Sequence, residues 1–208
     1  MRILPGIFVL FFVLTSLSVV AQGENLRSSA RLEIPCKHRT RVSSPSGRYS
    51  LVGFTRQQKM KGKCSQCKAL SSKLWLDDSV THVRTLLLEV NRSASSGWSP
   101  DGKSFYVEDD FGSNGTESYL YEISGLKKLD IGELIDSSDK VAKSLSGGHA
   151  YVRVEHWQDS KSLLVRFQGH TDEAPSTCFD FHYLVSRSGN VKKLSEQTGS
   201  PDATWCRF

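Results

Sequence analysis

Cysteines are the residues of this chain whose spacing most directly suggests chemistry. Cys64-Ser65-Gln66-Cys67 is a C-x-x-C pair, a spacing used in thioredoxin-type redox sites and in zinc sites. Cys36 and His38 could complete a tetrahedral zinc site. We favour disulfides, which persist in oxidising compartments, and therefore expect no metal and no cofactor. The cysteines available for bridges are Cys36, Cys64, Cys67, Cys178 and Cys206, an odd number that leaves one thiol over.

Histidines gather in the last third of the chain, where an acid–base site is conceivable. His170 and Asp172, together with His182, would be the residues of a small hydrolase. No H-x-x-x-H pair, G-x-S-x-G, H-E-x-x-H or phosphate-binding loop accompanies them. Cys178, Asp180 and His182 alternate with apolar residues, which predicts a solvent-facing side of one strand. We interpret the histidines as an exposed polar face and name no catalytic residue.

An acidic run could begin a calcium loop. Glu108, Asp109 and Asp110 precede a glycine-rich stretch, but the acid expected at the twelfth loop position is replaced by Tyr121. The EF-hand pattern therefore fails. Asn114-Gly115 is interpreted as the tip of a hairpin.

The first 21 residues have the layout of a secretory signal peptide. Arg2 precedes the uninterrupted apolar run Ile7 to Leu14, and Val19-Val20-Ala21 offers compact residues at a cleavage site. The apolar run is too short to predict a stable membrane anchor, although an uncleaved anchor is the alternative. We therefore expect residues 1–21 to be removed and residues 22–208 to be secreted or periplasmic.

Three stretches share one turn-and-strand shape. The clearest is Trp98-Ser99-Pro100-Asp101-Gly102-Lys103, and looser copies begin at Ser44 and Trp157. Proline fixes φ in a tight turn, aspartate or serine bonds back to the backbone, and glycine supplies a positive φ. We expect each turn to lead into a strand, with the tryptophans capping apolar layers between neighbouring sheets. The turn residues are Pro45, Gly47, Trp98, Pro100, Asp101, Gly102, Trp157 and Asp159.

Alternation elsewhere predicts an antiparallel all-β protein. Residues 118–123, 150–154 and 179–185 alternate apolar with polar side chains, and residues 83–90 predict a buried strand. Residues 129–145 have helical spacing instead and predict a short helical insertion that Ser137 or Ser138 could cap. We expect a single β domain, residues 22–208, of about three repeat units.

The S-P-x-G turn followed by Arg or Lys and an apolar strand resembles the repeat of TolB-type β-propellers. The resemblance rests on the three units around Pro45, Pro100 and Trp157. It implies propeller-like blade hairpins, arranged as an incomplete propeller or in a sandwich-like way, because closed rings usually hold more than three blades. An unrelated β-sandwich that uses the same turn chemistry is the alternative.

Charge is segregated along the chain. Residues 22–75 hold 12 Lys and Arg against 2 Asp and Glu, whereas residues 76–208 hold 14 against 20. The basic segment either binds an acidic partner or is neutralised by the acidic remainder. Nucleic acid is not expected, because export removes it and no aromatic residues interleave the basic cluster. The candidate partner-binding residues are Lys37, Arg39, Arg41, Arg48, Arg56, Lys59, Lys61 and Lys63.

Together these features predict an exported, non-catalytic binding module for an unknown protein partner. A small exported hydrolase with a site near His170 and His182 is one alternative. A structural component of an envelope assembly is the other.

Overall fold

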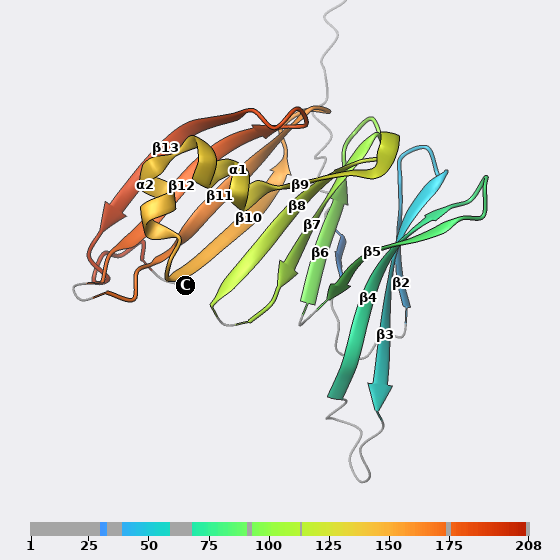
Figure 1. Cartoon of the computed structure of the whole chain (residues 1–208), viewed down its shortest axis with the longest axis horizontal. Helices are drawn as coiled ribbons and strands as arrows, with labels where there is room; N and C mark the ends of the chain where they lie inside the picture. The colour runs from blue at the N-terminus through green and yellow to red at the C-terminus, as the bar shows by residue number, and fades with distance from the viewer. Residues whose placement is uncertain are drawn as a thin grey trace, which may run out of the picture.

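The described part of the chain is mainly antiparallel β-sheet with two short helices (Figure 1). The computed structural model describes residues 30–32, 39–58, 68–90, 93–112, 114–173 and 176–206. In these ranges no helix combines the length and apolar character needed to cross a bilayer. The expected signal peptide lies outside the described residues, as do the predicted site residues Cys36, Lys37, Lys59, Lys61, Lys63, Cys64 and Cys67.

The strands form two sheets. The smaller sheet has the order β2 (Arg39–Ser43), β3 (Tyr49–Gln58), β4 (Lys68–Asp78) and β5 (Arg84–Val90). The larger sheet runs β1-β6-β7-β8-β10-β11-β12-β13, and β9 also pairs with β8. Its strands are β1 (Ala30–Leu32), β6 (Ser93–Trp98), β7 (Ser104–Asp110), β8 (Gly115–Glu122), β9 (Lys127–Asp130), β10 (His149–Trp157), β11 (Ser162–His170), β12 (Cys178–Ser186) and β13 (Val191–Gly199).

The strands group into three blade-like units. We call β2–β5 the first unit, β6–β9 the second unit and β10–β13 the third unit. Neighbouring strands within each unit pair antiparallel, and the second and third units join through a short parallel contact at residues 115–116 and 150–151. Among the described strands, the order ends at β13 without returning to β1. The expected antiparallel all-β fold of blade-like hairpins, as an incomplete propeller or in a sandwich-like arrangement, is confirmed.

A tight turn joins the first two strands of each unit. Gly47 and Gly102 adopt φ values of 72° and 66°, a region that strongly favours glycine. The N–H of each glycine donates to a serine carbonyl at 2.9 Å. In the third unit this turn contains no such glycine. The Asp159 carboxylate stabilises it instead by accepting from the N–H groups of Lys161 and Ser162 at 2.6 and 2.7 Å.

The second unit is buried on both faces because it lies between the other two (Figure 1). Phe105 packs with Leu51 of the first unit. Tyr106, the next residue, belongs to the core that contains Val165 and Phe167 of the third unit. Residues 104–107 are therefore all buried, as in a strand covered on both sides.

The two repeat tryptophans make the same contact between neighbouring units. Trp98 Nε1 donates to the carbonyl of Val42 in the first unit at 3.1 Å, and Trp157 Nε1 donates to the carbonyl of Gly97 in the second unit at 3.3 Å. Val42 and Gly97 occupy equivalent positions, three residues before the turn proline. Each tryptophan thus ties its unit to the preceding one.

The helical insertion consists of α1 (Ile131–Ser138) and α2 (Lys140–Leu145), after the 3₁₀ turn η1 (Ser124–Leu126). The predicted caps were wrong: Asp130 caps α1 and Asp139 caps α2 by accepting backbone N–H groups. Ser137 and Ser138 lie inside α1, where their hydroxyls donate to carbonyls one turn earlier. The helices bury apolar residues in the core of the third unit.

The strand predicted at residues 83–90 exists as β5, but it is not buried as predicted. β5 is an edge strand of the first unit, and Leu86 is 42% exposed. The run of leucines predicted a strand with both faces buried. In the structure, one face of this sheet packs against the second unit.

Candidate functional site

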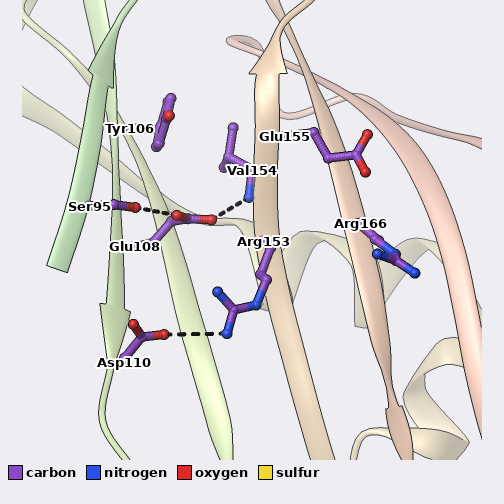
Figure 2. Close-up of a pocket in the computed structure, with 8 residues that line it drawn as sticks. All are labelled: Ser95, Tyr106, Glu108, Asp110, Arg153, Val154, Glu155 and Arg166. Atoms are coloured by element: carbon purple, nitrogen blue, oxygen red, sulfur yellow. Dashed lines mark hydrogen bonds and ion pairs between the residues drawn. The ribbon is translucent and has the colours of Figure 1, made fainter. Parts of the chain in front are cut away.

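A cleft of about 280 Å³ lies where the second and third units separate (Figure 2). β8 pairs with β10 at residues 115–116 and 150–151, and β9 then takes the same edge of β8 at residues 119–122. From Val152 onward, β10 therefore has no partner on that side among the described strands. Buried backbone N–H and carbonyl groups without partners cost free energy, so other groups must satisfy them.

Side chains of the second unit supply the missing partners. Ser118 Oγ donates to the carbonyl of Val152 at 2.6 Å, and the N–H of Val154 donates to Glu108 Oε1 at 2.5 Å. Glu108 Oε2 accepts from the hydroxyl of Ser95, so one carboxylate links β6, β7 and β10. Figure 2 shows this carboxylate between the strands with both contacts drawn. The innermost polar groups of the cleft thus hold the joint between two units.

Burial dominates the electrostatics of this joint. Removal from water raises the pKa of the Glu108 carboxyl, and the charge of Asp110 adds to the rise. The two hydrogen bonds that Glu108 accepts and the positive charge of Arg153 oppose it. Burial likewise raises the pKa of Tyr106, which lines the same cleft. Glu108 is therefore the carboxyl of the cleft whose charge is costly to keep.

The charges on the cleft rim contact one another. Arg166 donates two hydrogen bonds to Asp180 at 2.8 and 2.6 Å, and this pairing lowers the pKa of Asp180. Arg153 lies 3.7 Å from Asp110, whose oxygens also accept from two hydroxyl groups. Because these acids already have protein donors, the cleft is an internal polar network that joins strands.

Sequence reasoning missed the role of Glu108. The acidic run that contains it forms the end of β7, where alternation sends Glu108 toward the third unit and Asp109 the opposite way. These carboxylates cannot converge on one ion. A sequence signal that could have identified Glu108 is its place in β7: it directly follows the run Phe105-Tyr106-Val107, which is apolar on both faces of the strand.

The outer face of the first unit is the side of its sheet that points away from the second unit. Cross-strand pairing places Val52, Trp75 and Leu86 in one row across β3, β4 and β5, with Phe54 in the next row. Phe54 is 51% exposed. The β4–β5 turn, residues 79–83, adds two exposed valines. Val52 is buried and Trp75 is half-buried, so the exposed apolar side chains of this face are Leu86, Phe54 and the two valines.

The repeat indicates that this face is suited to packing. The carbonyls of Tyr49 and Ser162 close the turns of the first and third units. Val52 and Phe54 follow Tyr49 at the same distances in sequence as Val165 and Phe167 follow Ser162. Val165 and Phe167 are 0% and 2% exposed, because they lie in a core that also contains Ile135 of α1 and residues of the second unit. Phe54 stands at the same repeat position and is 51% exposed, whereas the residue at this position in the second unit is the buried Asp109.

Arginines border the outer face at the β4–β5 turn. Arg84 donates to both oxygens of Asp77 at 2.6 and 2.9 Å, and Arg41 donates to the same carboxylate at 3.2 Å. These hydrogen bonds lower the pKa of Asp77, and those from Arg84 have a larger effect than the one from Arg41. Two guanidinium groups on one carboxylate leave one positive charge uncompensated within this group. Together with His82 and Val83 they line a hollow of about 500 Å³.

Of the predicted partner-binding residues, Arg41 and Arg48 have described side chains. Arg48 donates to both oxygens of Asp78 at 3.2 and 2.9 Å and thereby lowers the pKa of that acid. Arg39 and Arg56 lie on β2 and β3, and the lysines fall outside the described residues. The described pairs fit neutralisation by acidic residues, while an acidic partner for the patch stays a prediction.

The histidines considered for a hydrolase do not meet. The partners of His170 and His182 in the β11–β12 ladder differ by four residues, which corresponds to roughly 13 Å along the strands. His170 stacks on His149 with ring centroids 4.4 Å apart, and His149 lies 3.5 Å from Asp172. Across the residues that the structure covers, no group of three His, Cys, Asp or Glu side chains could hold a metal ion.

One disulfide joins Cys178 and Cys206, with Cα atoms 6.0 Å apart. This agrees with the expectation of disulfide bonding, but the predicted exposure of Cys178 was wrong. Cys178 is 1% exposed, because the bridge holds the segment that contains Cys206 against this end of β12. The bridge is compatible with folding in an oxidising compartment.

The comparisons with known proteins show no family for this chain. No protein-family model and no curated protein matches it. Among solved structures, the β-propeller domain of the Trilobed protease from Pyrococcus furiosus, described as revealing an open velcro topology, is similar at a TM-score of 0.41 and 14% identity. The match covers 80% of this chain and 44% of that chain. The architecture given above rests on strand order and packing.

Proposed function

We propose that this protein is an exported, non-catalytic binding module that docks a protein partner on the outer face of its first unit. The observation that carries the proposal is the exposure of Phe54 at a repeat position that is buried in the third unit. A half-exposed aromatic ring beside Trp75 and Leu86 is the kind of surface that protein interfaces bury. TolB-type membership and export are parts of the proposal, supported by the repeat turns and the disulfide.

The charge around this face favours an acidic partner. Arg41 and Arg84 share one carboxylate, so an incoming acid meets an uncompensated positive charge. Complementary charge speeds association and discriminates against other proteins. A second copy of the chain fits less well, because Asp110 and Asp180 beside the cleft are already bound by its own Arg153 and Arg166.

Site-specific photo-crosslinking tests the docking face. A benzophenone amino acid replaces Phe54 in one variant and Phe111, a 44% exposed residue of the β7–β8 loop, in the control. Both variants are incubated with extract of the source cells, and crosslinked proteins are identified by mass spectrometry. We expect one acidic protein to crosslink from position 54 and not from position 111.

The identified protein is then purified and titrated against Phe54→Ser and against Leu194→Ser, which removes an equally exposed apolar side chain from β13. Weakened binding by the first variant alone supports the proposal. Equal crosslinking from both positions, or equal binding by both serine variants, contradicts it. Crosslinking of nucleic acid in place of protein also contradicts it.

A further inference from the structure

Building on the proposed function, we infer that the partner contributes an extended acidic segment in which a carboxylate and two apolar side chains alternate with outward-facing residues. The segment lies along the strands of the first unit. Its Asp or Glu binds Arg41 and Arg84, and its apolar side chains cover Trp75 and Phe54. The pattern is acidic-x-apolar-x-apolar, in either chain direction.

The spacing of the rows on the outer face sets this pattern. Asp77 and Arg84 form one row, Val52 and Trp75 the next, and Phe54 lies in the third. Successive rows are two residues apart along a strand, which corresponds to about 6.8 Å. An extended peptide repeats its side chains on one face at the same interval. Every second residue of the segment therefore meets one row.

The first row supplies the carboxylate site. Arg84 is held in a fixed orientation by its two bonds to Asp77, and Arg41 approaches the same acid from β2. Both arginine side chains remain about half exposed, at 49% and 50%. Planar guanidinium groups with spare N–H donors match a carboxylate well. The adjoining hollow leaves room for the acid, and Val83 forms an apolar part of its wall.

The next two rows supply the apolar sites. Trp75 and Leu86 pair across β4 and β5, so an aliphatic or aromatic side chain can cover both. Phe54 lies opposite Lys73, which is bound to Glu89 at 2.7 Å. This ion pair borders the third row, and Glu89 neutralises the charge of Lys73. Among the side chains that the structure describes, the positive charge available to the segment therefore lies at the Arg41–Arg84 end.

Selection from a phage-displayed library of random nine-residue peptides without cysteine tests the inference. We expect enrichment of peptides with the acidic-x-apolar-x-apolar pattern or its reverse. The consensus peptide is then synthesised and titrated calorimetrically into folded wild type and variants. Arg84→Gln, Arg41→Gln and Phe54→Ser should each weaken binding about tenfold or more, because each removes a direct contact.

Two control variants match these changes elsewhere on the molecule. Lys161→Gln removes an exposed positive charge from the β10–β11 turn, and Leu194→Ser removes an exposed apolar side chain from β13. Both should bind the consensus peptide within about twofold of wild type. Thermal melts verify that each variant is folded before titration.

The outcomes separate this inference from the proposed function. Peptides that need Phe54 but carry no acid would overturn the acidic segment and leave the docking face in place. Peptides that bind all variants equally would overturn both. If the library yields no enriched pattern, the inference of a linear segment is overturned. The same holds if no peptide is enriched and a single-stranded oligonucleotide binds in a way that depends on Phe54.

Discussion

Replacement of Glu108 should weaken the joint between the second and third units. Glu108→Ala leaves the N–H of Val154 and the hydroxyl of Ser95 without their shared acceptor. A buried polar group that loses its partner costs about 1–3 kcal/mol, so the variant should lose about 2–4 kcal/mol of unfolding free energy. At about 2–4 °C per kcal/mol for a chain of this size, the melting temperature should fall by roughly 5–15 °C.

Glu108→Gln separates the charge of the residue from its hydrogen bonds. The amide oxygen can accept from Val154, and the amide N–H₂ can donate to Ser95. Because burial raises the pKa of Glu108 in the folded state, its neutral form is favoured there. Its contribution to stability is complete below the pKa of the unfolded chain and is lost as pH rises through the folded pKa. The glutamine variant does not undergo this loss.

Urea unfolding of wild type and both variants between pH 4 and pH 8 provides the assay. The unfolding free energy of Glu108→Gln relative to wild type should rise with pH, because other carboxyl groups titrate equally in both proteins. A pH-independent difference would refute the argument about burial. An alanine variant as stable as wild type would refute the structural role of the joint.

Three further substitutions test the packing of the units by urea unfolding. Trp157→Phe keeps an aromatic ring but leaves the Gly97 carbonyl without its donor, and it should cost about 1–2 kcal/mol; no loss would remove this tie between units. Gly169→Ala places a Cβ 1.8 Å from the His149 carbonyl oxygen, so it should cost more than about 3 kcal/mol or prevent folding; a stable variant would contradict the β10–β11 pairing. Cys206→Ser opens a bridge between residues 28 apart and should cost about 3 kcal/mol without reductant; an unchanged midpoint would argue against the bridge.

Features set by neighbouring residues could be predicted from the sequence. The turns at Gly47 and Gly102 follow from local φ preferences, and the alternation of residues 179–185 marks the buried face of β12. The helical insertion follows from its apolar spacing, but its caps were missed. Asp130 and Asp139 lie immediately before each helix, whereas sequence inspection favoured serines within the first one.

Features set by contacts between units could not be predicted in this way. The sequence identifies Glu108 as acidic, but its role depends on the point at which β8 and β10 diverge. The exposure of Phe54 likewise depends on what packs on its face of the sheet, because the equivalent Phe167 is buried in a core that contains residues of α1 and of the second unit. Cysteine parity limits the number of bridges, whereas the pairing of Cys178 with Cys206 depends on the course of the C-terminal segment.

The dissociation constant of the crosslinked partner, measured with Phe54→Ser and Leu194→Ser side by side, tests the proposed docking face most directly. The account predicts at least about tenfold weaker binding for Phe54→Ser and an unchanged constant for Leu194→Ser. Unchanged binding by Phe54→Ser, with a folded protein, would contradict it.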